Sequence, residues 1–274
     1  MRDENPISMP NETYHFNGVA LLITHYNRSR SLERLLQSFR TLGCSFDEIV
    51  VSDDGSKPQH LEVIRELSNT YSFKLITTEI NRGLGNNINK GQDAVTAPLT
   101  LYVQEDFEPS EHFPSHFGDA LVFMKERSEL DIVRFYAYFK YPYTRPYLKG
   151  FLELLFRSAP WYTNHLKFHF YSDHPHLRRS NFFEKFGRYR EGISGDKTEY
   201  SMSLSFIRNK AQGLFYEAFT TLFYQKNSSD EPSTMGRASW RESKNPMILL
   251  IRFFYLQLKF IKCTFDLLRY PRKN

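Results

Sequence analysis

The chain has few cysteines, no long apolar run and no block of basic residues, and each of these shortages excludes or disfavours a class of protein. Its two cysteines among 274 residues, Cys44 and Cys263, lie far apart and fit no metal-ligand spacing, which favours a reducing compartment. No uncharged apolar stretch reaches about 18 residues, so we expect no membrane-spanning helix. The polar, acidic first residues are not typical of a secretory signal. Without a dense Lys/Arg segment, we expect no nucleic-acid partner.

The chain does have enough apolar material for a core. Apolar residues make up 41% of the sequence and aromatic residues 16%, which excludes disorder of the whole chain. Its length suits one α/β domain with an appendage, or two small domains. The formal net charge of +5 indicates either a moderately basic surface or a basic patch that faces a membrane or a phosphorylated ligand.

Three short apolar runs each end at a polar or acidic cluster. The runs are residues 19–23, 48–51 and 99–103, and the clusters after them are residues 24–27, 52–56 and 104–106. Runs rich in Val, Ile and Leu, separated by helical patterns, are typical of buried parallel strands. Because ligands of open α/β sheets bind at the carboxyl ends of the strands, we expect the three clusters to converge on one crevice.

Helical periodicity fills the segments between these runs. We expect helices that begin near Ser31, at Pro58 and after the turn 81–85, and a further strand at residues 73–77. The alternation predicts an α/β fold in which helices flank a mostly parallel, doubly wound central sheet.

The acidic clusters each have two interpretations. Asp53 and Asp54 suit hydrogen bonds to a ribose or a base, but Asp-Gly is also an ordinary turn with a helix cap. Glu105 and Asp106 offer the hard oxygen ligands that Mg²⁺ or Mn²⁺ prefers, but they also suit a solvated turn before Pro109. Finding both clusters at successive strand ends favours the functional interpretation.

The motifs together resemble one known family. Residues 19–28 (VALLITHYNR), 49–56 (IVVSDDGS), 81–85 (NRGLG) and 104–106 (QED) are similar, in order and spacing, to the nucleotide-sugar glycosyltransferases of family 2, which have the GT-A fold. The resemblance implies a Rossmann-like domain, a nucleotide-sugar donor such as a UDP-sugar, Mn²⁺ or Mg²⁺ as cofactor, and inversion at the anomeric carbon.

The resemblance also implies a role for each matching residue. Thr24 and Tyr26 would line the base pocket, Asp53 and Asp54 would hold the uracil or ribose edge, and Arg82 would lie beside the nucleotide. Glu105 would face the donor sugar, and Asp106 would bind the metal. Gln104 stands where the family usually has an acid, so the metal motif is one acid short.

The acceptor hydroxyl needs a carboxylate that takes its proton. In family terms, this base lies at a helix start within residues 192–202, where Lys197 stands in place of the usual second acid. Glu199 and Asp196 are therefore the candidates. We prefer Glu199, just inside a helix expected at residues 198–207, although an acid in a first turn also caps a helix.

Histidines and aromatic residues gather between residues 135 and 183. Their spacing does not favour zinc, because no pair of histidines has the interval of a zinc motif on an evident helix. In family terms this region is the acceptor side, and we assign His174 and His176 to it. Packing of the core is the alternative for most of the aromatic residues.

The resemblance divides the chain into segments. We expect a polar leader at 1–17, a catalytic domain at 18–225, a linker or lid at 226–245 and a C-terminal amphipathic helix within 246–274. The catalytic domain would consist of a donor half at 18–110 and an acceptor half at 111–225. Arg237, Trp240 and Arg241 in the lid are candidates to close over the diphosphate.

Residues 246–269 form a wide apolar face with a narrow basic one, which fits a helix that lies in the plane of a membrane. A helix docked on the domain or in a dimer is the alternative. The expected acceptor is a glycan or a lipid-linked molecule, so a helix in the membrane plane would place the enzyme at the inner, cytoplasmic face of the cytoplasmic membrane.

The rival functions are a nucleotide-sugar-binding protein with lost or altered catalysis and a nucleotidyltransferase. Residues 24–28 lack the glycine-rich triphosphate loop that a nucleotidyltransferase would have.

Overall fold

The structure is a computed structural model that describes residues 12–226 and 245–273. The described helices are α1 (Ser29–Thr41), α2 (Pro58–Tyr71), α3 (Leu84–Asp93), α4 (Phe113–Glu126), α5 (Phe182–Phe186), α6 (Gly195–Arg208) and α7 (Pro246–Arg269), with a 3-10 turn η1 (His165–Phe168). The described strands are β1 (Tyr14–His25), β2 (Cys44–Asp53), β3 (Lys74–Ile76), β4 (Leu99–Gln104), β5 (Phe107–Pro109), β6 (Ile132–Arg134), β7 (Thr144–Pro146), β8 (Phe151–Leu154), β9 (His176–Arg179), β10 (Gly213–Tyr216) and β11 (Phe223–Gln225).

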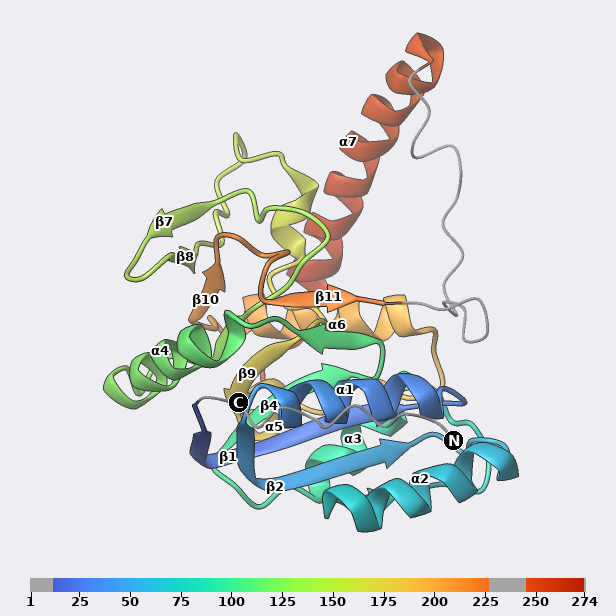
Figure 1. Ribbon diagram of the computed structural model, residues 1–274. Helices are drawn as coiled ribbons and strands as arrows, with labels where there is room; N and C mark the ends of the chain where they lie inside the picture. Colours follow the sequence, from blue (N-terminus) through green and yellow to red (C-terminus); the bar gives the residue numbers. More distant parts are fainter. Residues whose placement is uncertain (1–11, 227–244, 274) are drawn as a thin grey trace.

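One large sheet runs through the domain in the order β3-β2-β1-β4-β9-β6-β10-β8-β7, and β5 and β11 form a small second sheet. The strands β3, β2, β1 and β4 are all parallel. Beyond them β9 runs antiparallel between β4 and β6. The labels of β4 and β9 lie side by side near the centre of the ribbon (Figure 1). The sequence therefore predicted the α/β class and the parallel half, and the structure adds a mixed half that local patterns did not indicate.

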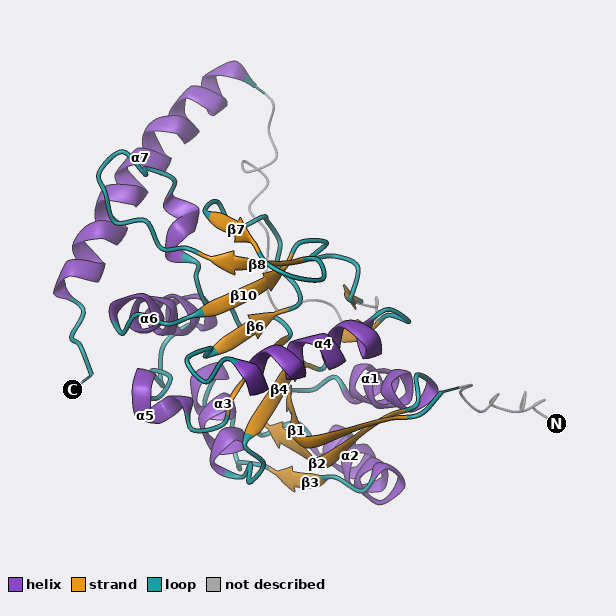
Figure 2. Cartoon of the chain, turned by 90° about the vertical axis from the view of Figure 1, so that its left-hand side faces the viewer, coloured by secondary structure: helices purple, strands orange, loops and turns teal. Residues whose placement is uncertain are grey.

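Helices cover both faces of the sheet (Figure 2). Successive side chains of β1 point to opposite faces, so Leu21 packs in a core with α1, α2 and α4, whereas Leu22 packs in a second core with α3, α5 and α6. Each helix begins only after a loop, so loops rather than helices lie at the carboxyl ends of the parallel strands, where ligands of open α/β sheets bind.

The C-terminal helix α7 has the bounds that the sequence predicted, Pro246–Arg269. Pro246 suits its first turn, and the side chain of Asn245 caps it by accepting a hydrogen bond from the Met247 N–H at 2.9 Å. Within residues 12–226 and 245–273, no helix is long and apolar enough to cross a membrane.

Candidate functional site at the strand ends

The three polar clusters meet at one edge of the sheet, as the sequence predicted. Thr24 at the end of β1 pairs with Ser52 of β2 on one side and with Gln104 of β4 on the other. The Glu105 N–H donates a hydrogen bond to the Thr24 carbonyl at 3.3 Å. Because β9 is antiparallel, its first residue, His176, lies opposite Tyr102 and brings the preceding loop to the same edge.

Asp53 and Asp54 have different surroundings, although the sequence treats them as a pair. Asp53 is fully buried and accepts hydrogen bonds from the His25 ring, from Ser56 and from the Thr77 hydroxyl. Burial opposes its ionisation, but the hydrogen bonds from His25 and Ser56 prevail and lower the pKa of Asp53 to about 2. Its negative charge therefore holds the end of β1 and the loop after β2 together from inside the domain.

Asp54 shapes the turn that follows β3. Its two carboxylate oxygens accept hydrogen bonds from the backbone N–H groups of Arg82 and Gly83 at 2.8 and 2.9 Å. Gly83 has a φ of +86°, which favours glycine. The side chain of Arg82 is exposed and lies 3.8 Å from Glu191. Asp54 thus orders the backbone that carries Arg82.

The base-pocket candidates also separate. The Thr24 hydroxyl is buried and forms a hydrogen bond of 2.9 Å with the Tyr102 hydroxyl. Tyr26 is only half-buried, one residue beyond the end of β1. Of these two residues, the structure leaves the side chain of Tyr26 accessible to a flat ligand, while Thr24 ties β1 to β4.

Arg28 lies beside Glu105 and Asp106, the two acids of the predicted metal motif, and the sequence analysis did not predict this contact. Its Nη1 lies 3.2 Å from Asp106 Oδ2 and 3.7 Å from Glu105 Oε1, and all three side chains are largely buried. Gln225 of β11 also donates a hydrogen bond to Asp106 Oδ2 at 2.9 Å. The only available signal was the place of Arg28 at the end of the first motif, three residues after β1.

The residues present fit a divalent cation at one point. Asp106 Oδ1 is buried and has no hydrogen-bond partner, which leaves one hard oxygen for Mn²⁺ or Mg²⁺. Within residues 12–226 and 245–273 there is no group of three or more His, Cys, Asp or Glu residues that would hold a metal by itself. A single carboxylate is enough where substrate phosphates supply further ligands, as is usual for Mg²⁺.

Glu199 lies near the first turn of α6, which begins at Gly195, slightly earlier than predicted. Its carboxylate accepts a hydrogen bond from the backbone of Asp173, in the loop before β9. Burial first, and then the negative charge of Asp173, raise the pKa of Glu199 to about 8, while the Arg134 guanidinium opposes the shift. Asp196, the other candidate base, is exposed.

Asp173 is a second residue that the sequence analysis missed. It is 4% exposed and accepts a hydrogen bond from the Tyr171 hydroxyl at 2.9 Å. Burial raises its pKa, and the Arg178 guanidinium opposes the shift. The Asp lies among aromatic residues and histidines, where no motif distinguished it.

His174 and His176, which the sequence analysis assigned to the acceptor side, differ in exposure. His174 is half-buried, and its ring meets the Tyr138 ring edge-on at 4.4 Å between centroids. Burial lowers the pKa of His174 to about 3, so the ring is neutral at ordinary pH. His176 is fully buried, with one ring nitrogen 3.0 Å from Arg178 Nη1 and the other 2.7 Å from the His174 carbonyl. Of the two, His174 is therefore the one with exposed surface.

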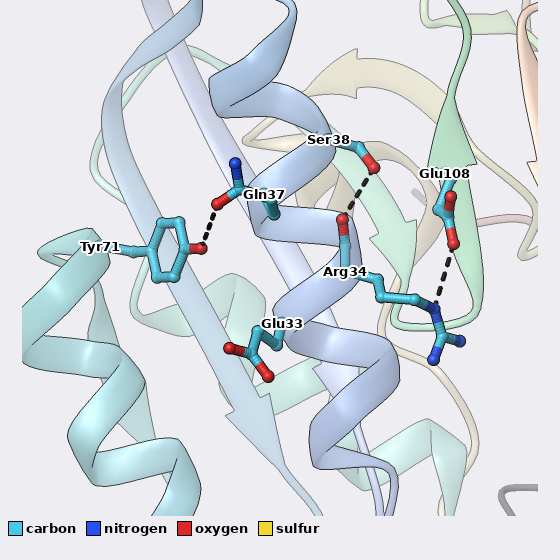
Figure 3. Close-up of a pocket in the computed structure, with 6 residues that line it drawn as sticks. All are labelled: Glu33, Arg34, Gln37, Ser38, Tyr71 and Glu108. Carbon is cyan, nitrogen blue, oxygen red and sulfur yellow. Dashed lines mark hydrogen bonds and ion pairs between the residues drawn. The ribbon is translucent and has the colours of Figure 1, made fainter. Parts of the chain in front are cut away.

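One cavity of the described chain lies away from the strand ends. It measures about 330 Å³, and its lining residues come from α1, the end of α2 and β5 (Figure 3): Glu33, Arg34, Gln37, Ser38, Tyr71 and Glu108. Inside it, Arg34 donates a hydrogen bond to Glu108 at 3.2 Å and Tyr71 donates one to Gln37 at 2.9 Å. These side chains satisfy one another, and none of the predicted site residues lines the cavity. Arg237, Trp240 and Arg241 lie outside the described residues.

Comparisons with known proteins agree with the geometry. The family model "Glycosyl transferase family 2" matches residues 20–187. A poly-beta-1,6-N-acetyl-D-glucosamine synthase of Staphylococcus epidermidis is 32% identical over 80 residues, 29% of this chain and 19% of that protein. A cholesterol galactosyltransferase of Borreliella burgdorferi is 27% identical over 127 residues, 46% of this chain and 34% of that protein. The chain thus spans from about a fifth to a third of these relatives.

A solved structure resembles most of the fold. The structure of S. aureus TarS 1–349 in complex with UDP-GlcNAc superposes with a TM-score of 0.56 at 16% sequence identity, over 90% of this chain and 72% of that one. The structure of S. aureus TarS 1–349 superposes with a TM-score of 0.55 at 15% sequence identity, over 90% of this chain and 72% of that one. At this identity the likeness concerns the fold, which both chains build from a GT-A sheet.

Proposed function

The chain belongs to glycosyl transferase family 2, and from this premise we propose that it transfers a sugar, with inversion, from a UDP-sugar to a hydroxyl group of a glycan or lipid-linked acceptor in cell-surface polysaccharide synthesis. One observation carries the proposal: Asp106 with its free oxygen and Glu199 with its raised pKa come from distant segments to the same edge of the sheet. The complex of TarS with UDP-GlcNAc supports this donor class.

In the proposed donor site, Tyr26 offers its ring to the base, and the turn held by Asp54 carries Arg82 beside the nucleotide. Thr24 and Asp53 contribute by fixing these elements, because their polar atoms already bind the protein. Glu105 lies one residue before Asp106 and is assigned to the donor sugar.

Asp106 would hold Mn²⁺ or Mg²⁺ through its free oxygen, and a bound cation would neutralise the charge that grows on the diphosphate leaving group. Arg28 lies within 3.2 Å of the same carboxylate. Its guanidinium adds positive charge where the metal motif has lost an acid at Gln104.

Glu199 is the proposed general base. Its carboxylate takes the proton of the acceptor hydroxyl as the acceptor oxygen bonds to the anomeric carbon and the nucleoside diphosphate leaves from the opposite face. A pKa of about 8 makes the ionised carboxylate a stronger base than an ordinary glutamate. Asp196 is the second candidate, and His174 is assigned to the acceptor because its neutral ring is partly exposed.

A location follows from α7. We place the enzyme at the inner face of the cytoplasmic membrane, in peripheral contact through residues 246–269, where a lipid-linked acceptor would be available. The positive charge of this segment and the exposed apolar side chains of α7 support the contact.

A nucleotide-sugar-binding protein without transferase activity is the second candidate. Gln104 and Lys197 favour it, since both stand where the family usually has an acid. The two candidates differ in whether the sugar–phosphate bond is broken.

The test uses the full chain with UDP-, GDP- and dTDP-sugars, with and without Mn²⁺. We expect one UDP-sugar to raise the melting temperature in the presence of Mn²⁺ and to release UDP, slowly by hydrolysis and faster with an acceptor glycan. Stabilisation with no UDP release, from wild type and E199Q alike, would instead identify the binding protein. Release of pyrophosphate from a nucleoside triphosphate and a sugar phosphate would identify a nucleotidyltransferase.

A further inference from the structure

Helix α7 presents a continuous apolar stripe to solvent. Seven side chains follow one another along it at intervals of four and three residues, and each is 48–73% exposed: Met247, Ile251, Phe254, Leu258, Ile261, Phe265 and Leu268. Because residues at these intervals share one face of a helix, the stripe extends along the whole length of α7. An exposed apolar surface of this extent indicates an interaction site.

The opposite face of α7 docks on the domain. Cys263 is buried, and Phe260 packs on the second core together with Phe168 of η1. Asp266 accepts a hydrogen bond from the Tyr200 hydroxyl of α6 at 3.0 Å. These contacts lie in the second half of α7, while its first turns extend beyond the rest of the described chain in both views (Figures 1 and 2). The apolar stripe is therefore held facing outward.

All of the net positive charge of the protein belongs to this segment. Residues 246–274 contain six Lys or Arg residues and one Asp, and residues 1–245 contain thirty basic and thirty acidic residues, so the formal charge of +5 of the whole chain equals that of its last 29 residues. Lys262 and Arg269 are one residue beyond Ile261 and Leu268 of the stripe. An apolar face bordered by cations suits a negatively charged lipid surface.

We infer that α7 lies in the plane of an anionic bilayer, with the stripe in the acyl region and Lys262 and Arg269 against the lipid phosphates. This inference deepens the membrane contact proposed above by specifying the residues that enter the membrane and the lipid charge that they recognise. The domain then contacts the face of α7 that points away from the membrane, through Phe260, Cys263 and Asp266.

A second copy of the chain is the rival occupant, since the four-three spacing is also that of a coiled-coil seam. The charges beside the stripe favour the membrane. The positions that border the stripe carry Lys262 and Arg269, and the one acid near them, Asp266, already pairs with Lys262 at 2.6 Å within α7, whereas coiled coils usually match charges across the seam.

The test measures co-sedimentation of the full chain with phosphatidylcholine vesicles that contain or lack phosphatidylglycerol. We expect binding to the anionic vesicles, weakened by salt, and at least about a tenfold loss of binding for I251Q/L258Q. K262Q/R269Q should lose the preference for anionic lipid. V122Q, which changes an exposed residue of α4, is the matched control and should bind as wild type does.

Other outcomes of the same measurements would contradict the inference. A wild-type chain that is dimeric by light scattering, that I251Q/L258Q makes monomeric and that ignores both vesicles would overturn the inference in favour of a second copy. UDP release in solution by I251Q/L258Q separates the two proposals. If UDP is released but the wild type does not bind vesicles, only the proposed membrane contact is refuted. If the wild type binds vesicles but no form of the protein releases UDP, only the proposed transferase activity is refuted.

Discussion

Replacing Glu199 by Gln should abolish sugar transfer and leave nucleotide binding intact. The amide keeps the size of the side chain but takes no proton, and a positioned general base contributes about 10²–10⁴-fold to a rate. We therefore expect the kcat of E199Q to fall by about that factor, while the dissociation constant of UDP changes little. The assay is UDP release with an acceptor glycan, alongside calorimetric binding of UDP.

The pH profile of the wild type tests the same assignment independently. With a pKa of about 8, about one-tenth of Glu199 is ionised at pH 7, so the rate should rise about tenfold between pH 7 and its plateau. Asp173 raises this pKa by its negative charge, so D173N should shift the profile to lower pH. D196N, at an exposed position, should shift it less.

The raised pKa also has a consequence for stability. The pKa of Glu199 in the folded chain lies above its ordinary 4.5, so its contribution to stability is fully present below pH 4.5 and is lost as the pH rises toward 8. E199Q should therefore show a flatter dependence of melting temperature on pH across this window. Near wild-type turnover by E199Q, or a flat wild-type rate between pH 6.5 and 9, would refute the assignment.

Two further predictions concern the proposed donor site, and a third concerns the packing at two glycines. D106N should weaken Mn²⁺ binding in the presence of UDP at least about tenfold by calorimetry, because a neutral amide oxygen replaces a carboxylate; unchanged affinity of the folded variant would exclude Asp106 as the ligand. The variant should also have a lower melting temperature, because it removes the negative charge that faces the largely buried Arg28 guanidinium. D54A removes the acceptor of two backbone N–H groups and should lower the free energy of unfolding in urea by about 2 kcal/mol and weaken UDP binding. In G85A the new Cβ would lie 2.3 Å from the Arg190 carbonyl oxygen, so we expect a loss of about 1–3 kcal/mol. G118A, whose Cβ would meet nothing within 4 Å, should gain about 0.5–1 kcal/mol in α4, and equal effects of the two glycine substitutions would contradict the packing argument.

The parts of the fold that local patterns encode were predictable. The strands before the polar clusters were recognised because apolar runs and turn residues alternate there, and Pro58 and Pro246 begin helices as expected. The insertion of β9 between β4 and β6 was not predicted. The position of β9 depends on pairing with strands that are distant in sequence, and its four residues carry no local signal for that pairing.

The candidate site was predictable in its location and less so in its roles. Asp53 and Asp54 are neighbours of identical type, yet one is sealed by His25 and the other holds a turn, because successive residues point in opposite directions. His174 and His176 differ for another reason, because His174 lies in the loop before β9 and His176 is the first residue of that strand. Arg28 reaches Asp106 across almost eighty residues of sequence, and such a pairing is visible only once the strands are aligned.

The central claim is that the edge of the sheet with Asp106 and Glu199 breaks the sugar–phosphate bond of a nucleotide sugar. The most direct measurement is UDP release from a panel of UDP-sugars by the wild type and by E199Q, with Mn²⁺ and an acceptor glycan. We predict release by the wild type, with inverted configuration in the product, and almost none by E199Q. Equal release by both proteins, or none from any nucleotide sugar, would contradict the claim.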